Sequence, residues 1–292
     1  MKPAPFTYHD PSTIDEAVAL LAAHENTRPL AGGQSLVPMM NFRYAMPDHI
    51  IDLNGVAPLA GVSTGVRITI GAMTRQRSVE FSTEILQAAP ILVEALKNVG
   101  HRQTRNRGTI GGSLCHLDPA AETPAMMMLH DADLTAVSVR GPRQIPVSEF
   151  ALGFMATALE PDELLTQIAF DAWPAGHGHG FEEYARRHGD FAIASCGVLL
   201  TLDASGTISR FATVVGGLAT APARLLDFEA KAVGARPDDD FVAAFAAAAS
   251  GVEAADDAHV SAAYRQHLAG VMAKRALKKA LASVGGKVLQ NA

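Results

Sequence analysis

Short stretches of alternating or continuous apolar positions predict the strands in the first part of the chain. The first is Phe6–His9, where apolar and polar side chains alternate. Further strands are predicted at residues 28–31, 49–53, 132–139 and 164–170, and residues 67–72 begin a second lobe. A strand, a helix, a second strand and then a glycine turn make a βαβ-like opening.

Three segments show helical spacing instead. Residues 12–24 have Ser12 or Thr13 as a cap, acidic residues in the first turn and one apolar face. Residues 82–96 are helical but are broken or restarted at Pro90. Residues 122–130 contain three consecutive methionines, which favour adaptable core packing over a ligand set.

The last third has a different pattern. Residues 174–180 carry glycine at every second position, which predicts a linker. After it, residues 191–203 and 208–216 alternate like an antiparallel pair. Residues 238–250 and 262–284 then predict two helices, and the basic end of the second suits a helix C-terminus. The predicted units are therefore residues 1–56, 57–176 and 177–292.

Composition narrows the function classes. The chain has 292 residues, 48% hydrophobic and 18% charged, with a net charge of −6. That balance argues against a general binder of nucleic acid or membrane surfaces. No apolar run is long enough to span a bilayer, and the N-terminus lacks the apolar core of a signal peptide. We therefore expect a cytoplasmic protein.

Metal-binding and nucleophilic motifs are scarce. The two cysteines, Cys115 and Cys196, are too few and too far apart for a zinc site or an iron–sulfur cluster, and we expect reduced, buried thiols. His177 and His179 form a His-x-His pair without an evident third ligand, so no metal site is predicted. The segment Gly33–Val37 lacks the last glycine of a nucleophile elbow, and no catalytic residue is predicted.

A repeated glycine motif is the strongest chemical signal. Pro29–Leu36 and Thr109–Leu114 each combine an apolar lead-in, a Gly-Gly pair, a small hydroxyl residue and leucine. Paired glycines can take positive φ, so successive amides can converge on phosphate oxygens. Two such loops facing each other would hold a pyrophosphate, although each could also be a plain turn. Neither a Rossmann glycine fingerprint nor a Walker A lysine is present.

The basic stretch His101–Arg107 precedes the second glycine pair. It is either a solvated loop or a positive field near cofactor phosphates or a docking partner. The sequence leaves these alternatives open.

Three segments together resemble a known family. Residues 31–38 (AGGQSLVP), 105–113 (RNRGTIGGS) and 118–122 (DPAAE) resemble the FAD-binding medium subunit of molybdenum hydroxylases, the flavoprotein of the carbon monoxide dehydrogenase and xanthine dehydrogenase family. The resemblance covers about residues 6–277. It implies an α+β fold, with a two-lobed PCMH-type FAD-binding domain and a C-terminal domain of antiparallel sheet and helices.

The resemblance also implies which residues bind non-covalent FAD. Amides of both glycine loops would hold the diphosphate, Glu122 (or Asp118) would accept from a ribose or ribityl hydroxyl, Leu165 would pack near the adenine, and Phe191 would cover the isoalloxazine. The full predicted set is Pro29, Leu30, Ala31, Gly32, Gly33, Gln34, Ser35, Leu36, Thr109, Ile110, Gly111, Gly112, Ser113, Glu122, Leu165 and Phe191.

Some positions depart from the family. Gln34 stands where many relatives have histidine, so it cannot titrate. Phe191 lacks the hydroxyl that a tyrosine would offer. Glu182 and Glu183 occupy a stretch where the family often has a lysine, which puts a charged contact to the cofactor in doubt.

The implied function is electron transfer within a complex. Electrons would pass from iron–sulfur clusters through FAD to an acceptor such as NAD⁺, oxygen or a quinone. The molybdenum cofactor and [2Fe-2S] clusters would lie on partners, a molybdopterin large subunit and an iron–sulfur small subunit, in a dimer of heterotrimers. The alternatives are a free-standing FAD-dependent oxidase or dehydrogenase of the same fold, and a scaffold that has lost FAD.

Overall fold

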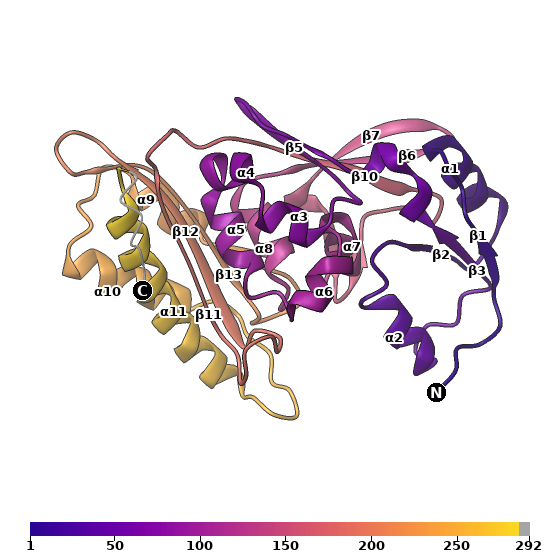
Figure 1. Ribbon diagram of the computed structural model, residues 1–292. Coiled ribbons are helices and arrows are strands. Elements are labelled where there is room, and N and C mark those ends of the chain that lie inside the picture. Colours follow the sequence, from indigo (N-terminus) through magenta and orange to yellow (C-terminus); the bar gives the residue numbers. More distant parts are fainter. Residues whose placement is uncertain (286–292) are drawn as a thin grey trace.

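The computed structural model describes residues 1–285, and three sheets follow one another along its long axis (Figure 1). A small parallel sheet lies at the N-terminal end, a five-stranded sheet occupies the centre, and a four-stranded antiparallel sheet lies at the C-terminal end. This confirms the predicted α+β class. None of the described helices is both long and apolar enough to cross a membrane.

The N-terminal sheet has the strand order β1-β3-β2, with all pairings parallel. The helix α1 is held at its start by a capping box, in which the Thr13 side chain accepts from the Glu16 amide and the Glu16 side chain accepts from the Thr13 amide. The elements are β1 (Thr7–His9), α1 (Ile14–Ala23), β2 (Thr27–Leu30), α2 (Leu36–Asn41), β3 (His49–Asp52), η1 (Leu53–Gly55) and η2 (Ala57–Leu59).

The central sheet has the order β4-β5-β10-β6-β7. Its edge strand β7 was not predicted, because Pro142 and Pro146 hide the strand pattern; proline is tolerated on an edge, where no amide has to pair. The strands are β4 (Val62–Ser63), β5 (Arg67–Gly71), β6 (Asp133–Ser138), β7 (Gly141–Pro146) and β10 (Leu164–Asp171), and a short hairpin of β8 (Ala151–Gly153) and β9 (Ala156–Thr157) follows η3 (Val147–Glu149).

Short helices connect β5 to β6. The predicted break at Pro90 is confirmed, because it is the first residue of a separate helix α5, where a missing amide costs no hydrogen bond. The helices are α3 (Gln76–Glu80), α4 (Thr83–Ala88), α5 (Pro90–Leu96), α6 (Arg102–Arg107), α7 (Ile110–His116) and α8 (Glu122–Leu129).

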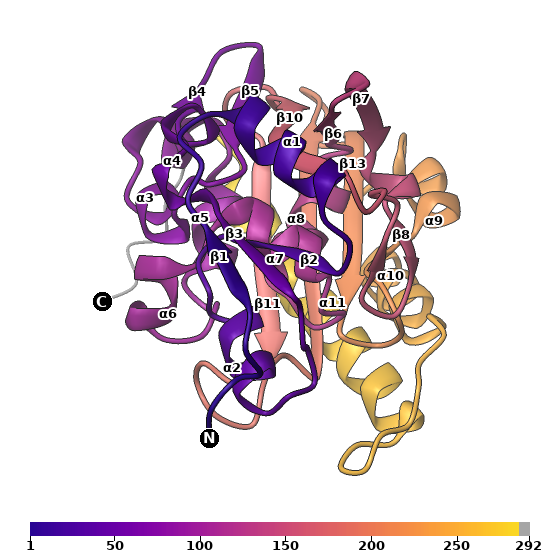
Figure 2. The ribbon, with the colours of Figure 1, turned by 90° about the vertical axis from the view of Figure 1, so that its right-hand side faces the viewer.

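The C-terminal sheet has the order β11-β12-β13-β14, and helices lie on both of its faces (Figure 2). The long helix α11 packs on β11 and β12 on one side, and α8 packs on β12 and β13 on the other. The elements are β11 (Gly178–Tyr184), β12 (Ala194–Leu202), β13 (Ile208–Gly216), β14 (Ala223–Arg224), α9 (Leu226–Ala232), α10 (Asp239–Ser250) and α11 (Ala262–Ser283).

The glycine-rich linker prediction is wrong for residues 178–180, which begin β11. A Cβ on Gly178 would lie 2.3 Å from the carbonyl oxygen of Ala280, and one on Gly180 would lie 2.3 Å from that of Ala276. Alternate glycines therefore let the strand approach the backbone of α11, rather than providing flexibility.

The apolar core crosses between the central and C-terminal sheets. Phe181, Leu199 and Val214 of the C-terminal sheet belong to the same buried cluster as Ile70 and Ile168 of the central sheet. The division at residues 56 and 176 stays a prediction.

Candidate cofactor-binding site

A cavity of about 920 Å³ runs between the N-terminal lobe and the central helices. Four stretches far apart in the sequence line it: residues 31–36, residues 111–113 with Thr109, residues 163–165 before and within β10, and residues 189–191. Both predicted glycine motifs therefore lie in the wall of one cavity.

The two motifs touch through their backbones. A Cβ on Gly32 would lie 2.3 Å from the carbonyl oxygen of Arg107, closer than non-bonded atoms can approach. A Cβ on Gly112 would lie 3.3 Å from the Cβ of Ala31. Glycine at position 32 is therefore required for the two loops to meet.

The first loop presents unpaired amides. Gly33 has φ of 73°, the left-handed region that favours glycine. Within residues 1–285, the backbone N–H groups from Gly32 to Ser35 donate to no protein acceptor. Gly32, Gly33 and Ser35 are half-buried and Gln34 is exposed. Half-buried amides normally have partners, so this row of free donors beside a cavity fits an anionic ligand.

The second motif differs from the prediction. Gly111 and Gly112 do not form a positive-φ loop; they lie in the first turn of α7. The Gly111 amide donates to the Ala72 carbonyl at 2.8 Å, and the Gly112 amide donates to the Thr109 hydroxyl at 3.0 Å. Because these amides already have protein partners, this motif is a capped helix start and not a second amide pocket.

Packing explains the second glycine pair. A Cβ on Gly111 would lie 2.5 Å from the Cβ of Ala72, at the end of β5. The pair therefore brings α7 close to the central sheet. Thr109 and Ser113 are the residues of this motif with hydroxyl groups that line the cavity, beside Gly111 and Gly112.

A polar bridge links the two loops, and the sequence analysis missed it. The Asn54 side-chain amide donates to the Ala31 carbonyl at 3.1 Å. Arg75 donates both to the Asn54 side-chain oxygen and to the Arg107 carbonyl. No motif marks either side chain, because their roles depend on the meeting of three distant segments.

Glu122 is the first residue of α8, as the helical interpretation predicted, and it also lines the cavity. Its contact with the cofactor stays a prediction. Burial, and then the charge of Glu183, raises the pKa of Glu122 to about 8. Asp118, the alternative, lines the cavity too, and its carboxylate accepts from the Ala120 amide at 2.9 Å. Burial also raises the pKa of the neighbouring Glu183 to about 7, so the Glu122–Glu183 pair of carboxyl groups can hold a proton near pH 7.

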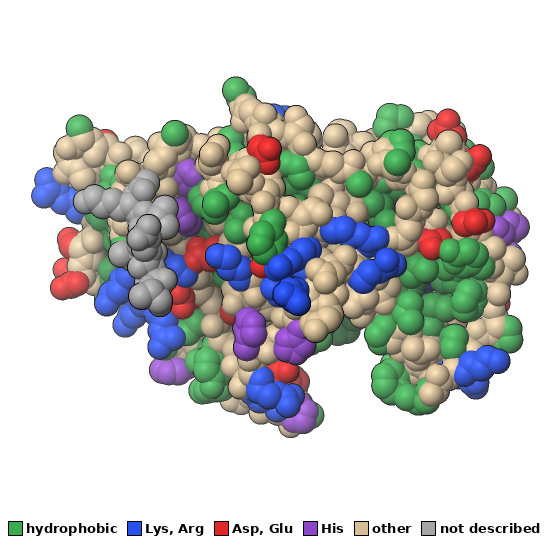
Figure 3. Space-filling view, viewed as in Figure 1, with side chains coloured by type: hydrophobic (Ala, Val, Ile, Leu, Met, Phe, Trp, Pro, Cys, Tyr) green, Lys and Arg blue, Asp and Glu red, His purple; other side chains and the backbone are tan. Residues whose placement is uncertain are grey.

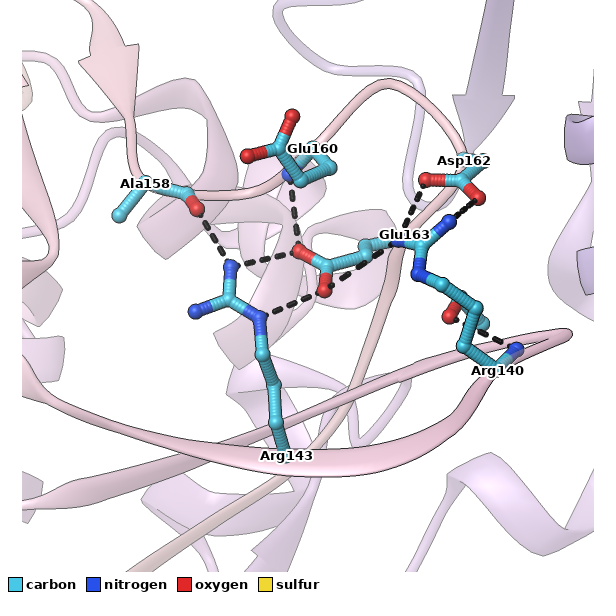
Figure 4. A network of polar contacts seen from close by, with 7 residues as sticks. Arg140, Arg143, Ala158, Glu160, Asp162 and Glu163 are labelled. Carbon is cyan, nitrogen blue, oxygen red and sulfur yellow. Dashed lines mark hydrogen bonds and ion pairs between the residues drawn. The ribbon is translucent and has the colours of Figure 1, made fainter.

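A salt bridge between Arg143 and Glu163 holds the segment just before β10 (Figure 4). Leu165 is the second residue of β10. Arg143 of β7 donates to the Ala158 carbonyl at 2.7 Å as well as to Glu163, and the Glu160 amide donates to Glu163 at 2.8 Å. These bonds, with that from Arg143 foremost, lower the pKa of Glu163. These contacts hold the segment next to the buried Leu165 in place.

Phe191 lies at the mouth of the cavity, with 67% of its surface exposed. Its loop packs against the basic stretch: a Cβ on Gly189 would lie 2.6 Å from the His101 ring. A large exposed aromatic side chain beside a cavity is a natural partner for a planar ligand ring.

The basic stretch is not the solvated loop of one alternative, because it forms α6. Arg105 is buried, donates to Glu80 at 2.8 Å and also donates to the Val99 carbonyl, so its role is structural. Lys and Arg side chains still gather over α3 and α6 on the face that Figure 3 shows.

The remaining predictions about reactive groups have mixed outcomes. Both cysteines are free, but only Cys196 is buried; Cys115 is exposed in the cavity wall.

Of the residues predicted for the cofactor, all except Leu30 and Ile110 line the cavity, and the Ile110 side chain is fully buried in the core. Glu182 pairs with Lys279 of α11 at 3.2 Å.

Family comparisons agree with this geometry. The model described as the FAD binding domain in molybdopterin dehydrogenase matches residues 4–173, and that described as the CO dehydrogenase flavoprotein C-terminal domain matches residues 179–280. The subunit alpha of a 6-hydroxypseudooxynicotine dehydrogenase complex from Paenarthrobacter nicotinovorans is 40% identical over 96% of both chains. The carbon monoxide dehydrogenase medium chain of Hydrogenophaga pseudoflava is 37% identical over 97% of this chain and 99% of its own.

Solved structures have the same fold. A carbon monoxide dehydrogenase from Hydrogenophaga pseudoflava superposes with a TM-score of 0.94 at 37% identity, over 98% of this chain and 100% of that one. Quinoline 2-oxidoreductase from Pseudomonas putida 86 gives 0.92 at 31% identity, over 99% and 100%.

Proposed function

The chain belongs to the family of FAD-binding subunits of molybdenum hydroxylases, and we propose that it serves as the electron-transfer flavoprotein of such a complex. It would pass electrons from iron–sulfur clusters on a partner chain to an external acceptor. Bound FAD supplies the redox chemistry, while the protein supplies binding, orientation and electrostatics.

The observation that carries the proposal is the row of free amides from Gly32 to Ser35, in the wall of a cavity that is large enough for a dinucleotide. A diphosphate accepts from such donors without requiring a buried cation. Thr109 and Ser113 of the adjoining second motif would add hydroxyl donors. The diphosphate would therefore be held mainly by the first motif, with the second giving close approach and hydroxyls.

The other predicted contacts are assigned by their places in the cavity. Glu122 would bond a ribose or ribityl hydroxyl, and in its neutral form it can donate as well as accept. Leu165 would pack against the adenine, and Phe191 would cover the isoalloxazine. Leu30 and Ile110 support their loops from behind.

The partners follow from the relatives. The 6-hydroxypseudooxynicotine dehydrogenase relative is a subunit of a complex, and the carbon monoxide dehydrogenase relatives are medium chains. We propose a molybdopterin large subunit and a [2Fe-2S] small subunit as the partners here, assembled as a dimer of heterotrimers. The substrate is then chosen on the large subunit.

Co-expression with the neighbouring genes tests this function. The chain should purify yellow, in complex with two other chains that bring molybdenum and iron. The substrate of the complex should bleach the flavin absorbance in the assembled complex and leave it unchanged in the isolated chain.

The free-standing FAD-dependent oxidase is the competing function. It predicts a flavin-loaded chain that purifies without partners and is reduced by its own small substrate. A colourless chain that takes up no FAD from solution would contradict both functions and leave the scaffold alternative.

A further inference from the structure

Three histidines converge at the outer edge of the N-terminal lobe, away from the cofactor cavity. Each of His9, His24 and His49 offers a ring nitrogen, and these atoms all lie within 4.8 Å of one another. His9 Nε2 lies 3.0 Å from His49 Nδ1. A histidine side chain is visible at this edge, beside β1 and β3 (Figure 3). None of the three lines the large cavity.

The βαβ topology produces this convergence. β1 and β3 are parallel neighbours with Thr7 opposite His49, so His9, two residues farther along, lies on the same face of the sheet as His49. The helix α1 runs back from the end of β1 and delivers His24, its C-terminal cap, to the same place. Three segments separated by up to 40 residues thus bring one imidazole each.

The three rings are stacked on one another. The His24 and His49 centroids are 4.2 Å apart with planes at 12°, and the His9 ring lies 5.1 and 5.3 Å from the other two. The stacking sets the three imidazole rings side by side, with one nitrogen of each close to a nitrogen of the other two.

We propose that His9, His24 and His49 bind a divalent transition-metal ion of the zinc class. Neutral imidazole is the ligand that such ions share, and hard cations such as magnesium prefer oxygen. With three protein nitrogens, solvent completes a tetrahedral site.

The geometry needs a modest rearrangement to close. Tetrahedral bonds of about 2.0–2.1 Å place ligand nitrogens about 3.4 Å apart. The His9–His49 pair, at 3.0 Å, has to open by only about 0.4 Å, and rotation of the rings brings the third nitrogen, now within 4.8 Å, to the same spacing. Rotation about χ2 of histidine is soft, so little strain opposes the change.

An ion can reach the cluster from solvent. Each of the three residues is half-buried, and His24 also lines a second cavity of about 410 Å³. Bound metal would tie β1, β3 and the end of α1 together, and so brace the lobe whose β2 leads into the glycine loop.

Zinc binding to the FAD-loaded, tag-free chain tests the proposal. Equilibrium dialysis against zinc chloride with metal analysis should give one zinc per chain. His49→Gln and His24→Gln should each weaken binding by at least about tenfold. His259→Gln, an exposed histidine elsewhere, is the matched control and should bind like the wild type.

Flavin content and thermal stability show whether each variant folds. If one of the two histidine variants does not fold, the other still tests the site. Cobalt(II) in place of zinc should give visible bands beyond the flavin absorbance, and these should be lost in both variants. A wild-type chain that holds no zinc at micromolar free metal, or variants that hold it as tightly as the wild type, would overturn the site.

Discussion

Arg143 donates to both carboxylate oxygens of Glu163, with Nε 2.6 Å from Oε1 and Nη2 2.7 Å from Oε2. Glu163 is almost fully buried, whereas the Arg143 side chain is partly exposed. The pair therefore joins the edge strand β7 to the segment that forms one wall of the cavity. Such bidentate pairs fix geometry as well as adding energy.

Removing the arginine should loosen that wall. Arg143→Met leaves the buried Glu163 carboxylate without its bidentate partner, with only Arg140 at 4.0 Å, and we expect a loss of about 2 kcal/mol in unfolding free energy and weaker FAD binding. Thermal unfolding and flavin titration measure both. Arg67→Met is the control: its pairs with Asp133 and Asp171 are exposed and lie outside the cavity, so the loss should stay below about 1 kcal/mol. Equal losses in the two variants would contradict this role of the salt bridge.

Gly32→Ala should block the meeting of the two loops, because its Cβ would lie 2.3 Å from the Arg107 carbonyl oxygen. We expect FAD affinity to fall by on the order of tenfold or more, equivalent to about 1.4 kcal/mol. The flavin-to-protein absorbance ratio after dialysis measures this. Gly153→Ala, where no atom lies within 4 Å, should keep full flavin content. Retention of flavin by Gly32→Ala would refute the contact.

Thr109→Ala removes the cap of α7, since the Thr109 hydroxyl accepts from the Gly112 amide. Loss of a cap costs about 1 kcal/mol. Ser82→Ala removes an equivalent cap from α4, outside the cavity. Both variants should lose similar stability without FAD, and only Thr109→Ala should also weaken FAD binding. Identical FAD affinities in the two would show that the Thr109 hydroxyl serves the helix alone.

Glu122 makes stability depend on pH. Its pKa is raised in the folded chain from 4.5 to about 8, so the folded state holds the proton more tightly than the unfolded state. This contribution is fully present below about pH 4.5 and is lost as the pH rises toward 8. Glu122→Gln stays neutral and should flatten the decline of melting temperature over that window. The exposed Glu253→Gln should leave the decline unchanged.

Much of the secondary structure could be predicted from local pattern. The helix start at Ser12 or Thr13, the break at Pro90 and the strands predicted at residues 6–9 and 164–170 follow from spacing and from single residues; the structure places the cap at Thr13 and the strands at residues 7–9 and 164–171. These signals act over a few residues, where backbone preference decides. The edge strand β7 was missed because its prolines are compatible only with an edge, and edge position is not a local property.

The site could be predicted in part. The glycine motifs and Glu122 stand out in the sequence, and the family resemblance supplies the cofactor. Asn54 and Arg75 could not be found, because ordinary polar residues gain a role only when distant backbone segments meet beside them.

By itself the sequence determined the class of fold, the family and the places where side chains had to be absent. Only the tertiary structure decided why they were absent: residues 32–35 form an amide-lined loop, whereas Gly111 lies in a helix pressed against Ala72. It also decided that three scattered histidines share one corner. The reason is physical: glycine permits both a left-handed turn and a close contact, and only the neighbours brought by folding select between them.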